Sequence, residues 1–474
     1  MNWRVISLGL IATLNACSMA PPLTPPKVDL PAEWQEAPPS VDGQWQEAAP
    51  AEANARGAWW TVFEDTTLNA LVTDAGAANQ DLVAAAARLE QARTLVNTAA
   101  AERLPRLDFG AGAAGGKIEN VGPLARAGGD IPSYERYRFG VAASYEIDLF
   151  GRVRDSVQAA RADSAAAAAL YQTLQLALQA EVARTYFLLR QTDAELGVLT
   201  EAVQLRRDAV RLLSTQANAG DISDLDLARA EAELQVTRTE QIGLTRTRAE
   251  LSHALAILLG KAPASFKLAP AALAARPPSV PAGLPSTLLE RRPDIAAAEN
   301  RLAAANARIG VAKTAFYPVL NLTADAGFAS GDIGELFSWS ARTWSLGPLA
   351  GALLTAPLFD GGRNRANLKR AEAALMEETA LYRQSVLRAF GEVEDALVGL
   401  RTLAEQTDTV AATRDAAERA LGIASQRYDA GAVGYLDVID ARRQTLATAR
   451  QQQQLRGARL QTTVALIRAL GGSW

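Results

Sequence analysis

The sequence predicts a mainly α-helical chain with a smaller transmembrane β part, built as an internal tandem duplication. Two stretches of more than sixty residues have continuous helical spacing, far more than a globular helix needs. Shorter stretches between them alternate apolar and polar residues with a period of two, as transmembrane β-strands do, and as any half-buried strand does. Most of these landmarks occur twice, about 211 positions apart, which indicates a duplication.

Composition narrows the function before any motif is considered. The 474 residues carry a net charge of −4 and 6% aromatic residues, with alanine runs such as residues 165–169. Alanine favours helices, and a nearly neutral chain gives no electrostatic support for binding nucleic acid. One histidine (His253) and one cysteine (Cys17) nearly exclude Cys/His metal sites, disulfides and a Cys–His dyad. We expect no metal or cofactor, no enzyme activity, and a packed or surface position for His253 on a helix.

The amino terminus has the features of a signal peptide in residues 1–16. A basic residue, a short apolar run and small residues precede Cys17. The letters LNAC resemble the bacterial lipoprotein signal box, which implies cleavage before Cys17 and lipidation there. Ser18 replaces the aspartate that would imply inner-membrane retention, so the resemblance implies the outer membrane. The alternative is a secreted protein with an unused cysteine.

Residues 17–57 are expected to form a lipidated, proline-rich extended arm, because proline excludes helix there. The first repeat, 58–262, begins with a predicted helix from Thr66 to Arg103. Two alternating strands follow. The second of them places Phe139, Val141 and further apolar residues on one face and Arg138, Ser144, Glu146 and Asp148 on the other.

The next segment, from Gly151 to about Ala217, predicts a helix of ~100 Å at 1.5 Å per residue. That length indicates a coiled coil or a helical tube. After a turn at Gly220, a second helix returns to about Lys261. A proline-rich joint, 263–292, then precedes the second repeat, 293–474, in which the same elements recur.

Four strands in one chain do not close a barrel. In lipid, open sheet edges leave backbone groups unsatisfied at several kcal/mol each. If the strands span a membrane, several chains must contribute to one barrel, so the sequence predicts an oligomer.

Several motifs together resemble those of one family. They are LPSTLLERRPDI (284–295), APLFDGGR (356–363), YDAGAVGYLDVIDARR (428–443) and the terminal ALGGSW. These resemble the TolC-like outer-membrane factors, in particular the lipoprotein subfamily that serves resistance-nodulation-division pumps. The resemblance implies a homotrimer in the bacterial outer membrane, with one 12-stranded barrel of four strands per chain and an α-helical tube through the periplasm.

The resemblance also implies a gate at the closed periplasmic end. Asp437 and Asp440 would form rings of carboxylates and Leu436 an apolar plug, and Asp224 and Asp226 lie in the first turn of the duplicated helix in the first repeat. Such a ring would hold cations and repel anions. The alternative is favourable helix-dipole and cap chemistry, because acids are common in the first turn of a helix.

The turn residues Gly220, Asp221, Gly431 and Gly434 are the expected contacts of a periplasmic membrane-fusion adaptor, although glycine also simply ends helices. The implied function is a passive exit duct for small molecules such as drugs, docked to that adaptor and to a proton-driven inner-membrane pump. The alternatives are a duct for type I protein secretion, a periplasmic hydrolase, and a structural coiled-coil lipoprotein.

Two further motifs are expected to be structural. Gly361 and Gly362 resemble part of a phosphate loop, but no Lys-Ser/Thr follows, so nucleotide binding is not expected. Arg291 and Arg292 are expected to be a solvated start of the helix that follows them.

Overall fold

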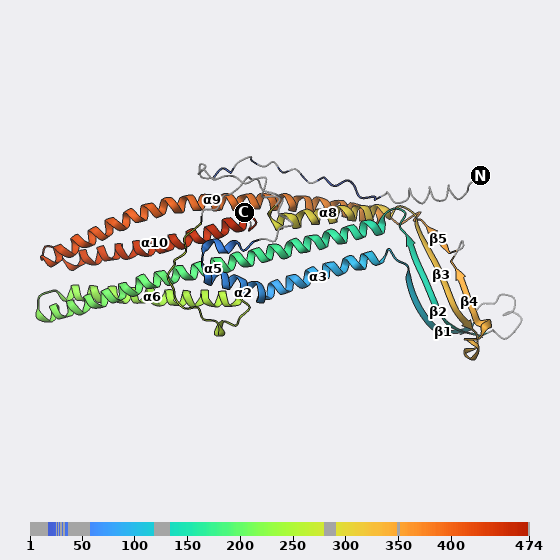
Figure 1. Ribbon diagram of the computed structural model, residues 1–474, viewed down its shortest axis with the longest axis horizontal. Coiled ribbons are helices and arrows are strands. Elements are labelled where there is room, and N and C mark those ends of the chain that lie inside the picture. The colour runs from blue at the N-terminus through green and yellow to red at the C-terminus, as the bar shows by residue number, and fades with distance from the viewer. Residues whose placement is uncertain are drawn as a thin grey trace. The chain divides into compact units, whose positions relative to one another are not determined.

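The chain forms two compact units in the computed structural model, whose helices and strands are drawn in Figure 1. One consists of residues 1–26, 88–168 and 297–382, and the other of 27–87, 169–296 and 383–474. The residues that the structure describes are 18–24, 26, 28, 31, 34–36, 57–117, 133–278, 291–347 and 351–472. Within those ranges, every helix is either too short or too polar to cross a membrane.

The elements repeat in the order that the sequence predicts. The first half contains η1 (Trp59–Phe63), α2 (Thr66–Ala78), α3 (Gln80–Ala101), β1 (Arg106–Lys117), β2 (Ser133–Ile147), α5 (Arg152–Ala219), α6 (Asp224–Leu258) and η2 (Pro263–Ser265). The second half contains α8 (Pro293–Thr314), β3 (Val319–Ser330), η4 (Ile333–Glu335), η5 (Trp339–Ala341), β4 (Arg342–Leu346), β5 (Ala352–Thr355), α9 (Arg363–Asp429) and α10 (Tyr435–Ala469).

The long helices α5 and α9 contain 68 and 67 residues, so each is ~100 Å long. Each is followed by a 35-residue helix that returns beside it. Side-chain hydrogen bonds join the members of each hairpin, from Gln241 to Thr200 at 2.8 Å and from Arg414 to Gln452 at 3.2 Å. The predicted pair of long helical hairpins is therefore present.

The expected single helix from Thr66 to Arg103 is wrong, because Asn79 interrupts it with an extended backbone. The Asn79 side chain accepts the N–H of Leu82 at the start of α3 and donates to the carbonyl of Leu258 in α6, both at 3.0 Å. The break therefore begins a new helix and satisfies a carbonyl at the end of another.

The strands form one antiparallel sheet in the order β1-β2-β3-β4, with β5 also paired to β3. Four strands were expected, and the fourth is divided into β4 and β5. These two pair with successive parts of β3, Leu346 with Ala324 and Ala352 with Leu322, so Thr323 lies between the two pairings. The Gly347 N–H donates to Thr323, and Thr323 donates to the Gly351 carbonyl. The fourth strand position is thus interrupted opposite Thr323.

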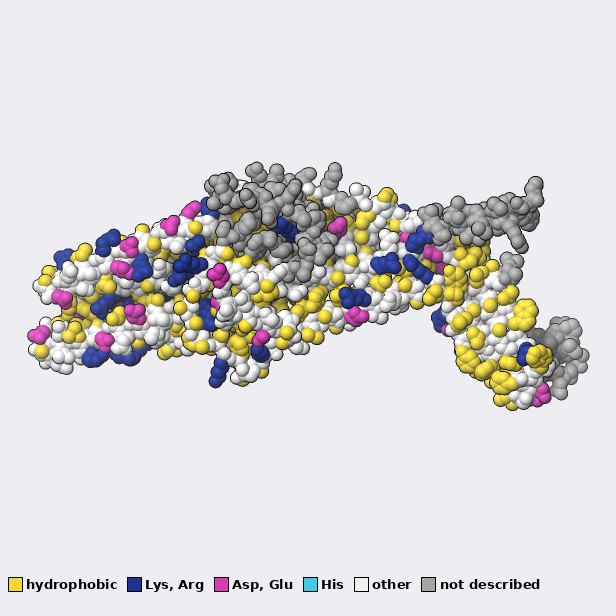
Figure 2. Space-filling view, in the orientation of Figure 1, with side chains coloured by type: hydrophobic (Ala, Val, Ile, Leu, Met, Phe, Trp, Pro, Cys, Tyr) yellow, Lys and Arg dark blue, Asp and Glu magenta, His cyan; other side chains and the backbone are white. Residues whose placement is uncertain are grey.

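The sheet has one apolar and one polar face. Directly opposed residues share a face, and the pairs Phe109–Val141, Phe139–Phe328 and Ala326–Trp344 lie on the apolar one. The pairs Asp108–Ala142, Ser144–Thr323 and Asp325–Ser345 lie on the other. The apolar face is exposed in the single chain, with 65% of Phe109 and 77% of Trp344 accessible, and hydrophobic side chains gather over the strands (Figure 2).

Aspartates begin both long helices. Asp148 accepts the N–H groups of Val153 and Arg154, and Asp360 accepts those of Gly362 and Asn364. The bonds from Asn364 and Gly362 hold the pKa of Asp360 below its usual value. This carboxylate already occupies the helix end at which a phosphate would bind, in agreement with the expectation that the Gly361–Gly362 pair is structural.

Arg292 is buried, so its expected solvated position is wrong. Its guanidinium donates to Asp294 at 2.6 Å, to Glu392 of α9 at 2.7 Å and to the Ala469 carbonyl of α10 at 2.9 Å. Burial opposes the charge, but these acids hold the pKa of Arg292 above its ordinary value. Arg292 therefore joins the start of α8 to α9 and to the last turn of α10.

Candidate functional site

The turns between the hairpin helices share one geometry. Gly220 has φ +80° and Gly431 has φ +70°, a conformation that L side chains rarely adopt. In each turn, the next N–H donates to the carbonyl five residues back, from Asp221 to Gln216 at 2.9 Å and from Ala432 to Arg427 at 2.8 Å. This Schellman arrangement closes the ends of α5 and α9.

The first turns of α10 expose one acidic face. Leu436, Asp437 and Asp440 are exposed in the single chain. The opposite face is buried in a cluster with residues from α5 and α6: Leu213, Ala230, Tyr435, Val438 and Ile439. Because the buried face packs on the chain's own hairpins, the two carboxylates point away from that core.

The first-repeat acids lie in a different electrostatic setting. Asp224 is exposed, whereas Asp226 is partly buried and forms an ion pair with Arg229 at 3.6 Å. At the 211-residue offset, Asp226 corresponds to Asp437, and Arg229 corresponds to Asp440. The first hairpin therefore carries an acid–base pair where the second carries two acids.

The cap of α6 is Ser223, whose hydroxyl accepts the N–H of Leu225 at 3.1 Å. The alternative interpretation of Asp224 as a side-chain cap is therefore wrong. Asp221 lies in the turn, where its N–H completes the Schellman motif.

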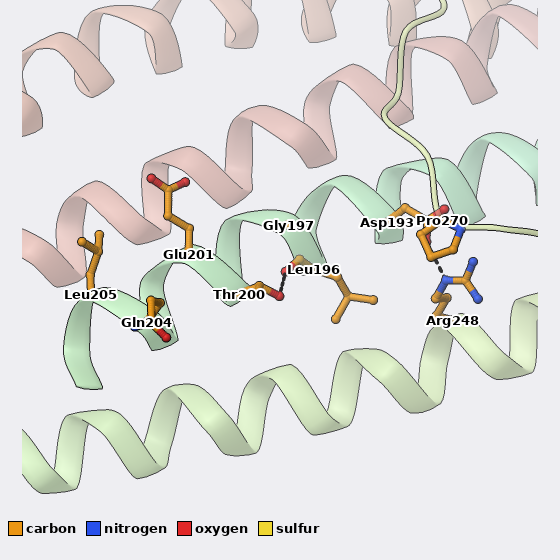
Figure 3. Close-up of a pocket in the computed structure, with 9 residues that line it drawn as sticks. All are labelled: Asp193, Leu196, Gly197, Thr200, Glu201, Gln204, Leu205, Arg248 and Pro270. Atoms are coloured by element: carbon orange, nitrogen blue, oxygen red, sulfur yellow. Dashed lines mark hydrogen bonds and ion pairs between the residues drawn. The ribbon is translucent and has the colours of Figure 1, made fainter. Parts of the chain in front are cut away.

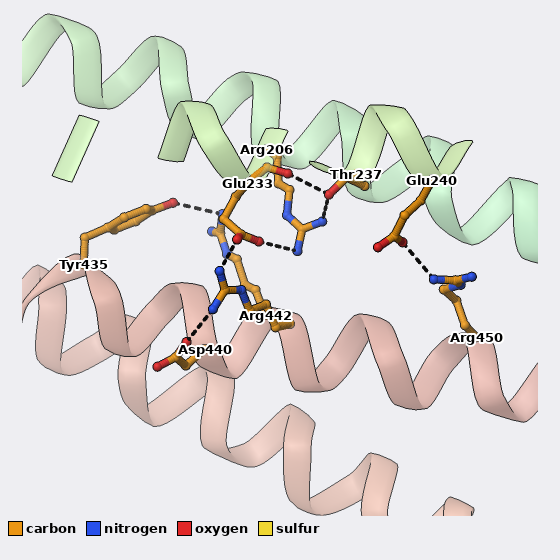
Figure 4. A network of polar contacts seen from close by, with 9 residues as sticks. Arg206, Glu233, Thr237, Glu240, Tyr435, Asp440, Arg442 and Arg450 are labelled. Carbon is orange, nitrogen blue, oxygen red and sulfur yellow. Dashed lines mark hydrogen bonds and ion pairs between the residues drawn. The ribbon is translucent and has the colours of Figure 1, made fainter. Parts of the chain in front are cut away.

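An arginine connects the acidic face of α10 to the first hairpin. Arg443 donates to Asp440 at 3.2 Å and also to Glu233 of α6, within the network of Figure 4. The bond from Arg443 holds the pKa of Glu233 below its usual value; burial opposes this effect, and the charges of Arg443 and Arg206 add to it. Asp440 is thus partly compensated. Asp437 has no ion-pair partner among the residues that the structure describes.

Further polar contacts continue this seam between the hairpins. Arg450 of α10 forms ion pairs with Glu240 of α6 at 2.8 Å and with Glu195 of α5 at 3.8 Å, and Gln454 donates to Glu195 at 2.9 Å. Figure 4 shows the Glu240–Arg450 pair beside Arg206 and Glu233. The two hairpins of one chain are therefore held together by charge as well as by apolar packing.

The turn glycines leave open space beside them. A Cβ atom built at Gly220, Gly431 or Gly434 would meet no other atom of the chain within 4 Å. Gly434 is the N-cap of α10 and supplies no side-chain cap. The positive φ of Gly220 and Gly431 requires glycine, whereas the extended backbone of Gly434 does not.

A cavity of about 640 Å³ lies beside α5 and α6 (Figure 3), and Asp193 is one of the residues that line it. This buried acid pairs with Arg190 at 2.9 Å and with Arg248 at 2.6 Å, and it accepts the N–H of Ala271 at 3.2 Å. Two guanidinium groups and a backbone donor already engage the carboxylate, which indicates a structural role.

The model of the outer membrane efflux protein family matches residues 71–261 and 284–472. The chain belongs to this family. It is 35% identical to the solvent efflux pump outer membrane protein SrpC of Pseudomonas putida, over 100% of this chain and 99% of SrpC. It is 34% identical to the outer membrane protein OprJ of Pseudomonas aeruginosa, over 99% and 96% of the two chains.

The fold is that of the solved outer-membrane efflux channels. The crystal structure of the Campylobacter jejuni channel CmeC covers 97% of this chain, with a TM-score of 0.86 and 27% identity, and 95% of CmeC is matched. The sequence-based identification of a TolC-like outer-membrane factor is therefore confirmed, together with its outer-membrane location.

Sequence reasoning missed the partners of the acidic residues. The bridge from Arg443 to Glu233 crosses 210 positions, so no local pattern reveals it. The contrast between Arg229 and Asp440 was visible once the two repeats were aligned at their common offset. The expected lipidation residue, Cys17, lies outside the described residues.

Proposed function

We propose that this outer-membrane efflux channel is the exit duct of a tripartite pump and works as a homotrimer. It exports small molecules, drugs among them, without an energy source of its own. A periplasmic membrane-fusion adaptor docks to the channel, and a proton-driven inner-membrane pump supplies the energy. The relative SrpC carries the name of a solvent efflux pump component, which supports this assignment.

The sheet is the observation that carries the proposal. It has an exposed apolar face, and β1 and β4 are the end strands of its described order. Lipid would cover the apolar face but would leave the two edges unsatisfied. Three chains with four strand positions each would close a 12-stranded barrel, which removes every edge.

The gate belongs to the same proposal. In a trimer, Leu436, Asp437 and Asp440 would each occur three times around the periplasmic mouth, and Asp224 and Asp226 would accompany them. Like charges at close range repel, so the ring would attract cations and disfavour anions. The open tips at Gly220, Asp221, Gly431 and Gly434 would receive the adaptor.

Conductance of the purified trimer in a planar bilayer tests the gate. The double substitution Asp437→Ala, Asp440→Ala is expected to lower cation preference and to weaken block by divalent cations. Asp226→Ala is the matched control at the equivalent first-repeat position. Its effect should be smaller, because Arg229 already compensates Asp226. Unchanged selectivity in the double variant would remove the gate assignment.

We also propose that Cys17 carries the lipid anchor and that residues 1–16 are removed, with residues 17–57 as the arm. Mass spectrometry of the N-terminal peptide tests the modification. Heating membrane extracts before gel electrophoresis tests the trimer, which should persist as a heat-resistant band. A monomer that leaves the membrane in a salt wash would contradict the duct.

A further inference from the structure

The polar face of the sheet carries two arginines close together. Arg136 and Arg138 lie on the same side of β2 as Ala142, because alternate residues of a strand share a face. Both arginines are exposed, and neither forms an ion pair with a residue that the structure describes. Two uncompensated positive charges therefore occupy successive positions on this face.

These arginines lie far from the end of the sheet that leads into the helices. β2 ends at Ile147, shortly before α5 begins at Arg152. Arg138 is 147 − 138 = 9 positions from that end, or ~30 Å along the strand. In the proposed duct the long helices lie in the periplasm, so the arginines would lie near the outer opening of the barrel.

Negative charge lies nearer the helices on the same face. Asp108 and Asp325 are directly opposite Ala142, four positions further along β2 than Arg138. Asp108 pairs with Arg106 at 2.9 Å, whereas Asp325 has no ion-pair partner in the described part of the chain. The polar face is therefore divided into a basic zone at its free end and an acidic zone behind it.

A row of glycines separates the two zones. Gly110, Gly140 and Gly327 lie directly opposite one another on β1, β2 and β3. A Cβ atom at Gly140 would lie 2.7 Å from the carbonyl oxygen of Ala326. At Gly327 it would collide with the carbonyl oxygen of Phe139. The close approach of β2 and β3 thus excludes larger side chains from this row, which stays open.

The polar face is hollowed at the glycine row. A cavity of about 540 Å³ is lined by the row, by both arginines and by Asp325 with Asp108. Because all of these residues belong to the polar face, the cavity opens on that face. A guanidinium group can donate two parallel N–H bonds to a carboxylate or a phosphate, and the hollow leaves room for such a group beside Arg138.

We infer that Arg136 and Arg138 form an anion-binding filter in the lumen, near the outer end of the barrel. In a trimer the pair would occur three times around the axis. Fixed positive charge there would concentrate small oxoanions, carboxylates and phosphates among them, and would disfavour cations. The filter has the opposite sign to the acidic face of α10. This inference rests on the proposed function, because the polar face becomes a lumen only when the sheet closes.

The ion selectivity of the purified trimer in a planar bilayer tests the filter. The background is the double variant Asp437→Ala, Asp440→Ala, so that the acidic face of α10 does not set the reversal potential in a potassium chloride gradient. Adding Arg136→Gln and Arg138→Gln should lower the ratio of chloride to potassium permeability about threefold, because fixed charges beside the path of the ions are removed. An unchanged ratio would overturn the inference.

Arg342→Gln is the matched control. Arg342 lies opposite Phe328 on the apolar face. The next residue, Ala329, lies opposite Arg138 on the polar face, so the two arginines are at similar heights on opposite sides of the sheet. Arg342→Gln should leave the permeability ratio unchanged, and so should Arg138→Lys, which keeps the charge. A shift in Arg342→Gln as large as that in Arg138→Gln would contradict a luminal filter.

Inorganic tripolyphosphate tests binding directly. It should block the current of the background channel, and the block should weaken at higher salt because charge is screened. In Arg136→Gln, Arg138→Gln the half-blocking concentration should rise about tenfold, since charge-assisted hydrogen bonds to the phosphates are lost. A background channel that tripolyphosphate does not block would overturn the filter.

The yield of heat-resistant trimer separates this inference from the proposed duct. Arg136→Gln, Arg138→Gln with the trimer yield, selectivity and block of its background would overturn the filter and leave the duct standing. The single variants, each of which keeps one arginine, should show part of the shift and give the same test if the double variant does not assemble. A wild-type chain that forms neither trimer nor conducting channel would overturn both.

Discussion

One carboxylate, that of Asp65, binds two groups in the core of the second unit. Its Oδ1 accepts the Leu68 N–H at 3.0 Å as the N-cap of α2, and its Oδ2 accepts the Tyr186 hydroxyl at 2.7 Å. Burial, together with Asp65, raises the pKa of Tyr186 to about 12, although the neighbouring Arg190 acts against this. Tyr186 and Phe63 belong to the same apolar cluster. Asp65 thus connects helix initiation to core packing.

Asp65→Ala is expected to destabilise the protein by about 2–4 kcal/mol, because it removes a cap and leaves the buried Tyr186 phenol without its acceptor. Asp65→Asn, which can cap the helix and accept the phenol, should cost less, and Tyr186→Phe about 1 kcal/mol. Thermal unfolding followed by circular dichroism measures all three. Equal stability of the Ala and Asn variants would contradict this double role.

Glu233 makes the seam between the hairpins sensitive to acid. Its folded pKa is lowered, chiefly by Arg443, so its contribution to stability is present above the unfolded pKa of about 4.3. That contribution is lost as the pH falls through the folded value. We expect hydrogen exchange near Glu233 to stay constant from pH 8 to about 5, after correction for intrinsic rates, and protection to fall below about pH 4. Glu233→Gln should flatten this acid dependence, and an unchanged profile would contradict the assignment.

At the scale of elements, substitutions of the two turn glycines of the second hairpin are expected to have opposite effects on stability. Gly431 has a positive φ, so Gly431→Ala should cost about 1 kcal/mol from backbone strain. Gly434 is an extended N-cap without a side-chain acceptor, and its first-repeat counterpart is Ser223. Gly434→Ser should therefore be neutral or stabilise by a few tenths of a kcal/mol. Melting temperatures measure both effects. A destabilising Gly434→Ser would show that the tip requires glycine at this position.

The regular elements followed from the sequence because their signals are local or periodic. The first long helix was expected from Gly151 to about Ala217, and α5 runs from Arg152 to Ala219. The break at Asn79 was missed because its cause, the carbonyl of Leu258, lies 179 positions away. The burial of Arg292 depends on Glu392 and on Ala469 at the end of α10, which lie 100 and 177 positions away in sequence.

The acidic face was only partly predictable. The i, i+3 spacing of Asp437 and Asp440 placed both on one side of a helix, and the structure exposes that side. The partial compensation of the Asp440 charge could not be predicted, because Arg443, which provides it, also binds Glu233 on another helix. The division of the fourth strand depends on Thr323 of its neighbour, which no pattern in residues 342–355 contains.

For the whole molecule, the two faces of the sheet predict opposite responses to the same charge. Val141 lies opposite Phe109 and Ala326 on the apolar face, whereas its neighbour Ala142 lies opposite Asp108 and Asp325. In a barrel, Val141→Arg should cost about 2–4 kcal/mol near the middle of the bilayer. Ala142→Arg should be tolerated, since it points to the lumen between two acids.

The yield of heat-resistant trimer in outer-membrane fractions measures both variants of the sheet. Val141→Arg is expected to reduce the yield strongly and Ala142→Arg to leave it near the wild type. Equal yields would show that the apolar face does not meet lipid.

The first repeat has Arg229 where the second repeat has Asp440, and this difference has a consequence for assembly. Six hairpin ends around a threefold axis would have similar backbones but would alternate in charge. A partner that recognised only shape could dock in two registers, one-sixth of a turn apart. A partner with basic tips would settle in one of them, because only every second end would attract it. One substitution in a duplicated gene would then suffice to select a unique alignment.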